Sequence, residues 1–164
     1  MIHTMIVSFL ESFKYIGHFY PIAFLRVYLG YFYLEQASFH YNGDFSIQPQ
    51  LSEMINQWAP SSGAPGWYQD FLIQIVAEQW QFFSSAISVT EFLIGLSLVL
   101  GYLVRPFTVL AAFVAMHFLW ISSPDQSLLY KTLIAVNLSL CWLGAGRCFG
   151  IDYYFYKKMR GWLW

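Results

Sequence analysis

The sequence is short of charge. Only 10% of its 164 residues are Asp, Glu, Lys or Arg, whereas soluble domains average about 25%. In contrast, 58% of the residues are hydrophobic, 21% are aromatic and the mean hydropathy is +0.49. The net charge of −1 provides no basic field for nucleic acid, which excludes that class of partner. This composition predicts a single integral membrane domain.

Cysteine is scarce as well, with only Cys141 and Cys148. On a continuous helix these two Cα atoms lie about 10 Å apart, beyond the roughly 7 Å that a disulfide tolerates. The sequence also lacks a CxxC pair, a haem-type CxxCH motif and a Gly-rich nucleotide loop. These absences indicate neither a disulfide nor a haem site.

Long apolar runs account for much of the chain. Residues 86–104 carry one formal charge, Glu91, and come close to the ~20 residues that cross a bilayer. Arg105-Pro106 is expected to end this helix, and a new run, 107–121, begins at once, which predicts an antiparallel hairpin. With 21–41 and 127–144 as further spans, the predicted fold is all-α, an integral membrane four-helix bundle.

The remaining segments predict surface structure. Residues 1–20 have apolar side chains at helical spacing and predict an amphipathic helix on the membrane. The outer loop, 42–85, predicts two helical turns over 51–58 and an interfacial helix from Trp67 onward. Residues 145–164 form a basic, aromatic tail.

Basic residues are missing from two of the connecting segments. Residues 42–85 and 122–126 contain no Lys or Arg, whereas the turn at Arg105 and the tail at 145–164 are basic. The positive-inside rule therefore places both termini in the cytoplasm and the long loop outside, in a bacterial-type inner membrane.

Four titratable residues fall at a similar predicted depth near the outer surface: Glu35, Glu91, His117 and Lys131. Ionisable groups inside a membrane often mark a proton path or ligand site. The alternative is an ion pair of Glu91 with Lys131 or with Arg26, which would only fix how the helices pack. The helical periodicity also places Glu91 on one face with Ser84, Ser88, Gly95 and Tyr102.

The first span has two faces. Arg26 and Glu35 lie about 180° apart, and Arg26 shares its face with His40, as well as with Gly30, Tyr33 and Ala37. We expect this face to meet Glu91, with Glu35 turned toward another subunit, the interfacial helix or headgroups. His40, His117, Glu35 and Glu91 are suitable metal-ligand types. However, no Glu-x-x-His or His-x-x-x-His pair exists, and we expect no metal.

Several motifs together resemble the DoxX/DoxD family from about residue 21 to 155. They are the Arg-Gly first span at 25–30, Pro-Gly-Trp-Tyr-x-x-Phe-Leu at 65–72, and the residues Glu91, Gly95, Gly101, Arg105, Gly144, Gly146, Arg147 and Asp152. The loop around Trp67 is closer to the DoxD branch, the membrane subunit of thiosulfate:quinone oxidoreductase. The resemblance implies a four-helix membrane bundle that works with quinone as electron acceptor. The chain lacks the lysine that many relatives carry near the end of the first span.

Two functions follow from these residues. As a quinone-linked oxidoreductase subunit, the chain would pass electrons from a sulfur compound or partner protein to quinone. Glu91, Arg26 and His117 would be catalytic, and His40, Glu35 and Lys131 would be relays or ligands. The alternative is a non-catalytic accessory or assembly subunit, docked through its aromatic outer loop. Under both hypotheses the partners of the chain are the lipid bilayer and other membrane or periplasmic protein subunits.

Overall fold

The computed structural model describes residues 20–159, and this part of the chain is helical, without a β-strand. The predicted N-terminal surface helix falls outside the described residues. In chain order the α-helices are α2 (Tyr20–Asn42), α3 (Asp44–Ile47), α4 (Gln50–Trp58), α5 (Gly66–Phe71), α6 (Trp80–Leu100), α7 (Val104–Ile121), α8 (Ser127–Leu143) and α9 (Asp152–Met159). A π-helical turn, Leu72–Val76, follows α5. Short 3-10 turns occupy Ala59–Ser61, Pro124–Gln126 and Ala145–Arg147.

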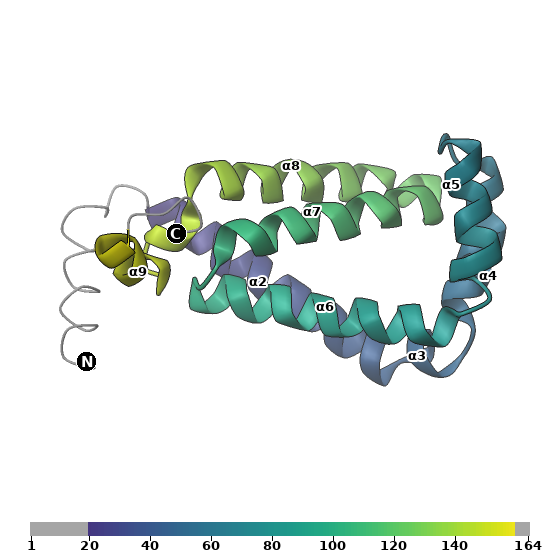
Figure 1. The fold of residues 1–164 in the computed structure, drawn as a ribbon, viewed down its shortest axis with the longest axis horizontal. Coiled ribbons are helices and arrows are strands. Elements are labelled where there is room, and N and C mark those ends of the chain that lie inside the picture. The colour runs from purple at the N-terminus through teal and green to yellow at the C-terminus, as the bar shows by residue number, and fades with distance from the viewer. Residues whose placement is uncertain (1–19, 160–164) are drawn as a thin grey trace.

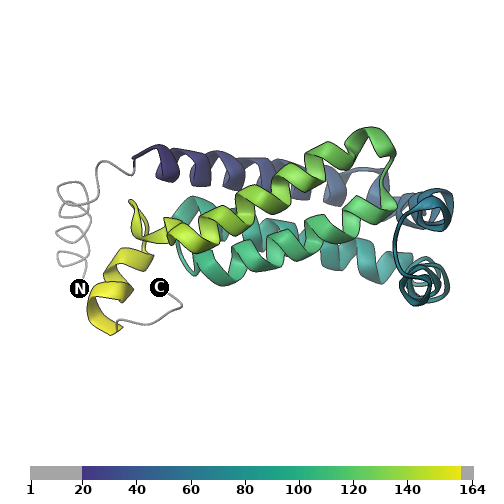
Figure 2. The same cartoon turned by 90° about the horizontal axis from the view of Figure 1, so that it is seen from above.

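The four longest helices, α2, α6, α7 and α8, run side by side along the length of the molecule (Figure 1). The closest packing pairs α2 with α6 and α7 with α8. At one end α4 and α5 lie across the bundle, where Figure 2 shows them end-on. At the other end lies α9 (Figure 1). The all-α prediction is confirmed.

The turn between α6 and α7 differs from its prediction. The helix ends at Leu100 and not at Arg105, because Gly101 and Leu103 adopt left-handed backbone conformations, with φ of 67° and 54°. Pro106 lies in the first turn of α7. There the absent N–H of a proline costs nothing, since the first helical N–H groups have no intrahelical acceptor. The proline starts the second helix of the hairpin and does not end the first.

Two glycines let α2 and α6 approach closely. A Cβ built on Gly95 would lie 2.7 Å from Leu34 Cγ and 2.9 Å from the Gly30 carbonyl oxygen. A Cβ on Gly30 would lie 2.9 Å from the backbone nitrogen of Val99. The backbones of the two helices are therefore in direct contact at this level, and no side chain fits between them.

Gly95→Ala is expected to destabilise the protein by about 1–2 kcal/mol. The added methyl group overpacks the contact, which costs roughly 1–3 kcal/mol. The higher helix propensity of alanine offsets up to about 1 kcal/mol of this loss. The matched control is Gly63→Ala, because a Cβ on Gly63 would have no atom within 4 Å. Thermal unfolding in detergent measures both variants, and equal melting temperatures would contradict the close α2–α6 contact.

The predicted outer loop folds as a packed cap over one end of the bundle. Its helices α4 and α5 match the predicted turns at 51–58 and the helix from Trp67. Leu51, Ile55 and Leu72 are almost fully buried, and they belong to one apolar cluster with Phe118 and Ile121 of α7. Hydrophobic burial thus fixes the cap to the bundle and holds the side chains at this end of the bundle in place.

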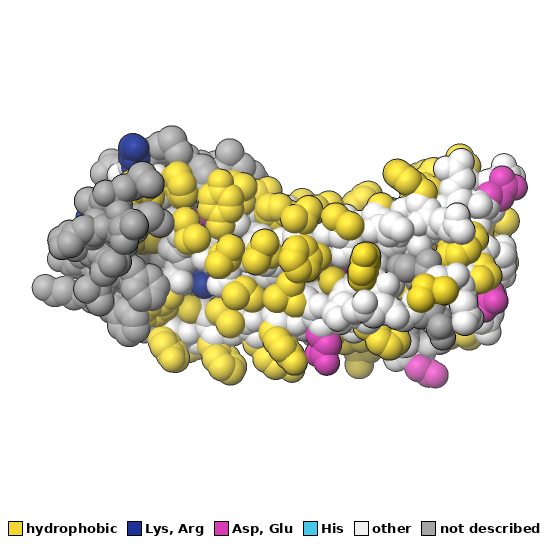
Figure 3. Space-filling view, turned by 90° about the horizontal axis from the view of Figure 1, so that it is seen from below, with side chains coloured by type: hydrophobic (Ala, Val, Ile, Leu, Met, Phe, Trp, Pro, Cys, Tyr) yellow, Lys and Arg dark blue, Asp and Glu magenta, His cyan; other side chains and the backbone are white. Residues whose placement is uncertain are grey.

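The surface of the bundle is apolar along its middle (Figure 3). Large hydrophobic side chains point outward from α2, α6 and α7, among them Phe24, Phe92 and Phe113. By length and composition α6 and α7 could each cross a membrane. Acidic side chains gather toward the end that carries the cap in Figure 3.

Candidate functional site

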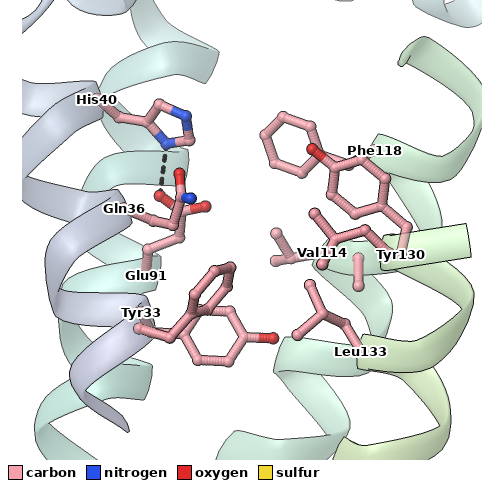
Figure 4. Close-up of a pocket in the computed structure, with 11 residues that line it drawn as sticks. Tyr33, Gln36, His40, Glu91, Val114, Phe118, Tyr130 and Leu133 are labelled. Atoms are coloured by element: carbon pink, nitrogen blue, oxygen red, sulfur yellow. Dashed lines mark hydrogen bonds and ion pairs between the residues drawn. The ribbon is translucent and has the colours of Figure 1, made fainter. Parts of the chain in front are cut away.

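A buried carboxylate and an imidazole form the centre of the site. Glu91 of α6 is 4% exposed, and its Oε2 atom lies 2.6 Å from Nδ1 of His40, near the end of α2. Figure 4 shows this pair at the upper side of the pocket. At this distance the two groups share a hydrogen bond whose proton can belong to either one. The pair therefore places two groups that can exchange a proton across one hydrogen bond.

Aromatic rings hold the His40 imidazole in place. Its ring stacks on Phe45, with centroids 4.2 Å apart, and lies nearly parallel to Phe118 at 6.0 Å. Phe118 in turn stacks on Tyr130 of α8 at 5.6 Å. This row of rings joins α2, the cap, α7 and α8, so it fixes the imidazole opposite Glu91.

Below the pair lies a small, partly open cavity of about 40 Å³. Its wall includes both groups of the pair together with Phe32, Tyr33, Gln36, Val114, Ala115, Phe118, Leu129, Tyr130 and Leu133 (Figure 4). A buried water needs roughly 10–15 Å³, so the cavity has room for about three. It is too small for a ring-sized ligand, for which pockets of about 300 Å³ or more are usual.

An open groove of about 420 Å³ lies on the outer side of the same residues. It shares Gln36, His40, Phe118, Leu129 and Tyr130 with the inner cavity. Its other residues are Glu35, Phe39, Phe45, Gln50, Met54 and Gln126. The groove is large enough for an aromatic ring, offers amide groups for hydrogen bonding, and has His40 on its wall. His40 thus lines both a ligand-sized groove and a water-sized cavity.

The inner side of the cavity ends at a polar contact between helices. Asn137 of α8, which is fully buried, donates a 2.9 Å hydrogen bond from Nδ2 to the Tyr33 hydroxyl and a second one to the Leu133 carbonyl. Oδ1 of Asn137 has no hydrogen-bond partner among residues 20–159. The contact ties α2 to α8 below the Glu91–His40 pair.

Arg26 lies at the opposite end of the bundle, so the predicted contact between Arg26 and Glu91 is wrong. Its buried guanidinium donates to the carbonyl oxygens of Ala145 at 2.8 Å and Cys148 at 2.7 Å, and to that of Phe149 at 3.3 Å. These bonds fix the segment after α8 against α2. The predicted face is the one that packs inward: Arg26, Gly30, Tyr33 and Ala37 are buried, and His40 is partly buried against Glu91.

Asp152 completes this second cluster. Its two carboxylate oxygens accept hydrogen bonds from the backbone N–H groups of Leu103 and Val104, at 2.7 and 3.0 Å. Burial raises the pKa of this carboxyl group, while the two N–H donors and the charges of Arg26 and Arg105 oppose the rise. A Cβ on Gly146 would collide with Asp152 Oδ2.

Glycines of the family motifs make the same cluster compact. A Cβ on Gly101 would lie 2.8 Å from a terminal nitrogen of Arg26, and one on Gly144 would lie 2.9 Å from a terminal nitrogen of Arg105. Arg147 rests over the Tyr156 ring at 3.9 Å. These motif residues therefore close one end of the bundle, and the geometry gives them a structural role: Arg26, Gly101, Arg105, Gly144, Gly146, Arg147 and Asp152.

The other predicted residues do not join the Glu91–His40 pair. His117 bonds through Nδ1 to the Phe113 carbonyl and faces a different pocket, under the cap. Lys131 is exposed on α8, outside the lining of the groove and the cavity. Glu35 is exposed and lines the outer groove. Ser84, Ser88 and Gly95 are buried on the Glu91 face as predicted, but Tyr102 is exposed because α6 ends before it.

Sequence reasoning missed Phe45 and the Tyr33–Asn137 contact. Phe45 lies in the outer loop, and nothing in its spacing assigns it to His40. Asn137 interrupts an apolar run, which is a signal for an interhelical hydrogen bond. Within residues 20–159 no group of three or more His, Cys, Asp or Glu side chains could hold a metal ion.

Comparison with known proteins gives one family. The family model described as "TQO small subunit DoxD", where TQO stands for thiosulfate:quinone oxidoreductase, matches residues 21–163. No curated protein and no solved structure matches the chain. The matched range spans nearly the whole chain and includes the pair, the groove and the Arg26 cluster. The family match and the apolar helices α6 and α7 together identify the chain as a membrane protein.

Proposed function

Because the chain belongs to the DoxD family, we propose that it is the quinone-binding membrane subunit of a thiosulfate:quinone oxidoreductase-like enzyme. In this proposal α2, α6, α7 and α8 all cross the membrane, as a four-helix membrane bundle. The cap lies on the outer side, and α9 lies on the cytoplasmic side. The absence of Lys and Arg from 42–85 and the basic residues near Arg105 and Arg147 support this orientation.

One observation supports a redox role above all, which is the position of the Glu91–His40 pair. The pair is buried, yet His40 also lines the open groove. A proton that a ligand in the groove exchanges with His40 can be replaced from Glu91 over 2.6 Å. A pair that only fixed helix packing would not need to face a ligand-sized groove.

The groove residues fit a quinone ring. Phe39, Phe45, Phe118 and Tyr130 offer aromatic surface, and Gln36, Gln50 and Gln126 offer amide donors for ring oxygens. When bound, a quinone takes up two electrons and two protons and leaves as the quinol. His40 would hydrogen-bond one ring oxygen and supply one of the two protons, and Glu91 would reprotonate His40. The other ring oxygen would take its proton from water at the mouth of the open groove. The electrons would come from a sulfur compound or from a partner protein.

His40→Phe is expected to slow thiosulfate-dependent quinone reduction by at least about tenfold, because phenylalanine keeps the stacking on Phe45 but cannot carry a proton. The measurement uses the enzyme purified with its partner subunits from its own membranes. Lys131→Gln is the matched control, since Lys131 lies outside the groove and the cavity. A folded His40→Phe enzyme with the full rate would contradict the proposal.

An assembly role is supported by a separate observation. Ile47 and Trp67, on the cap, are 71% and 73% exposed. Exposed apolar side chains of this size commonly contact lipid or another protein. If docking were the main function, Trp67→Ser would separate the subunits while His40→Phe would leave the assembled enzyme fully active. The two variants therefore distinguish the two roles.

A further inference from the structure

A pocket of about 320 Å³ lies under the cap, between the cap and the helices α6 and α7. Ten of the eleven residues that line this cap pocket are Leu, Ile, Val or Phe. Within residues 20–159, no Asp, Glu, Lys or Arg side chain contributes to the lining. Cavities lined by such apolar side chains stay dry and take up apolar molecules. The lining therefore suits a hydrocarbon.

His117 is the remaining residue of the lining. Its Nδ1 atom lies 2.8 Å from the carbonyl oxygen of Phe113, one turn earlier on α7. A carbonyl oxygen can only accept, so Nδ1 carries a proton and donates it within its own helix. This bond uses one of the two ring nitrogens and leaves little in the wall to attract a polar group.

The cap pocket has a buried floor and an open edge. Leu51 of α4 and Leu72 of the π-helical turn belong to the floor and are 0% and 2% exposed. Phe71 and Phe113 are exposed members of the same lining. Leu110, one turn before Phe113, is exposed as well. The edge of the pocket is thus continuous with the apolar outer surface of α7.

This edge lies at the depth of lipid tails. The 18 residues of α7 extend over about 27 Å, close to the roughly 30 Å of a bilayer's hydrocarbon core. Phe113 comes eight residues before Ile121, the last residue of this helix, which is about 12 Å along the axis. When α7 crosses the membrane, Phe113 therefore lies within the hydrocarbon core. The lipid groups at that depth are acyl chains.

We propose that the cap pocket binds one acyl chain of a membrane phospholipid, from the leaflet on the side of the cap. The chain enters past Phe71 and Phe113 and lies against the floor, while the headgroup stays at the membrane surface. At roughly 30 Å³ for each water-sized group, the pocket has room for about ten methylene groups, so it takes part of a chain and not a whole lipid. A bound chain also restores the van der Waals contacts that an empty pocket would lack. This site is separate from the groove at His40 and does not depend on the proposed redox role.

Photo-cross-linking in a defined bilayer tests the site. The full chain is placed in nanodiscs of phosphatidylcholine that carries a diazirine near the end of one acyl chain, and labelled residues are identified by mass spectrometry. We expect labels on Leu51 and Leu72, which lipid around the bundle cannot reach because these side chains are buried. Leu138, which is exposed on α8 and outside the pocket, reports ordinary contact with lipid.

Two variants fill the pocket from opposite sides. Val76→Trp fills it from the π-helical turn and Ile87→Trp from α6, where the side chain is only half-buried and a larger residue is easier to accommodate. Each should lower the labelling of Leu51 and Leu72, relative to Leu138, at least about tenfold, because the indole occupies the volume that the chain needs. Ile75→Trp is the matched control and should label as wild type, since Ile75 is exposed on the same turn and outside the lining.

Three results would overturn the proposal. One is a wild-type protein that is labelled at Leu138 but not at Leu51 or Leu72, a result that does not depend on how any variant folds. Another is unchanged labelling of these two residues in folded Val76→Trp and Ile87→Trp. The third is loss of both labels when a small molar share of an isoprenoid quinone is added to the nanodiscs, which would assign the pocket to the tail of that molecule.

Discussion

Glu91→Gln should reduce the rate of quinone reduction by about 100-fold or more while the protein remains folded. The amide has the shape of the carboxylate and can still hydrogen-bond to His40 across the 2.6 Å contact. It cannot bind and release a proton, and general acid–base catalysis typically contributes about 10²–10⁴-fold. The loss should therefore appear in the turnover rate rather than in the amount of folded enzyme.

Two further measurements make this result specific. Glu53→Gln is the matched control, because Glu53 is an exposed carboxylate on α4, outside the groove lining. Its turnover should stay within about twofold of wild type, since surface substitutions rarely perturb a fold. Full activity of folded Glu91→Gln would mean that the pair only fixes helix packing, and the assembly role would then be preferred.

The sequence predicted most of the secondary structure, for a clear physical reason. Apolar runs of about twenty residues form helices in a lipid bilayer, because there every backbone N–H and C=O group must find its hydrogen-bond partner within its own segment. The helices at 51–58 and from Trp67 followed from short amphipathic patterns. The hairpin turn was misplaced because a proline can start a helix as well as end one, and the decisive signal was Gly101 in a left-handed conformation.

The candidate site was predicted in part. Helical periodicity correctly put Glu91 with Ser84, Ser88 and Gly95 on a buried face. The same reasoning on α2 gave Arg26 and His40 one face, but they are fourteen residues apart, or about 21 Å along the helix. Only one of them can reach Glu91. In depth Glu91 lies nearer to His40 than to Arg26, and in the structure His40 makes the contact, which was not predicted.

Other parts of the site depend on packing that no local pattern contains. The position of Phe45 against His40 depends on how the cap folds over the bundle. The direction of His117 follows from its place on α7, on the side that faces the cap pocket. The bonds of Arg26 to Ala145 and Cys148 join residues more than a hundred positions apart, where a sequence gives a charge but not its partner.

Arg26→Met should destabilise the protein by about 3–5 kcal/mol, because it removes the donor for three backbone carbonyls at once. The carbonyls of Ala145, Cys148 and Phe149 would lose that donor. The carboxylate of Asp152 would also lose a neighbouring positive charge. Thermal unfolding in detergent measures the loss.

Two more variants distinguish this structural role from the catalytic role that the sequence suggested for Arg26. Arg147→Met is the control, since Arg147 is only half-buried and stacks over Tyr156, so its loss should cost about 1 kcal/mol. Arg26→Lys keeps the charge but has a single nitrogen in place of the planar guanidinium. It should be less stable than wild type, yet whatever fraction folds should reduce quinone at the normal rate. A stable Arg26→Lys protein with a strongly lowered rate would instead mean that the guanidinium acts on the reaction, although it lies at the opposite end of the bundle from Glu91.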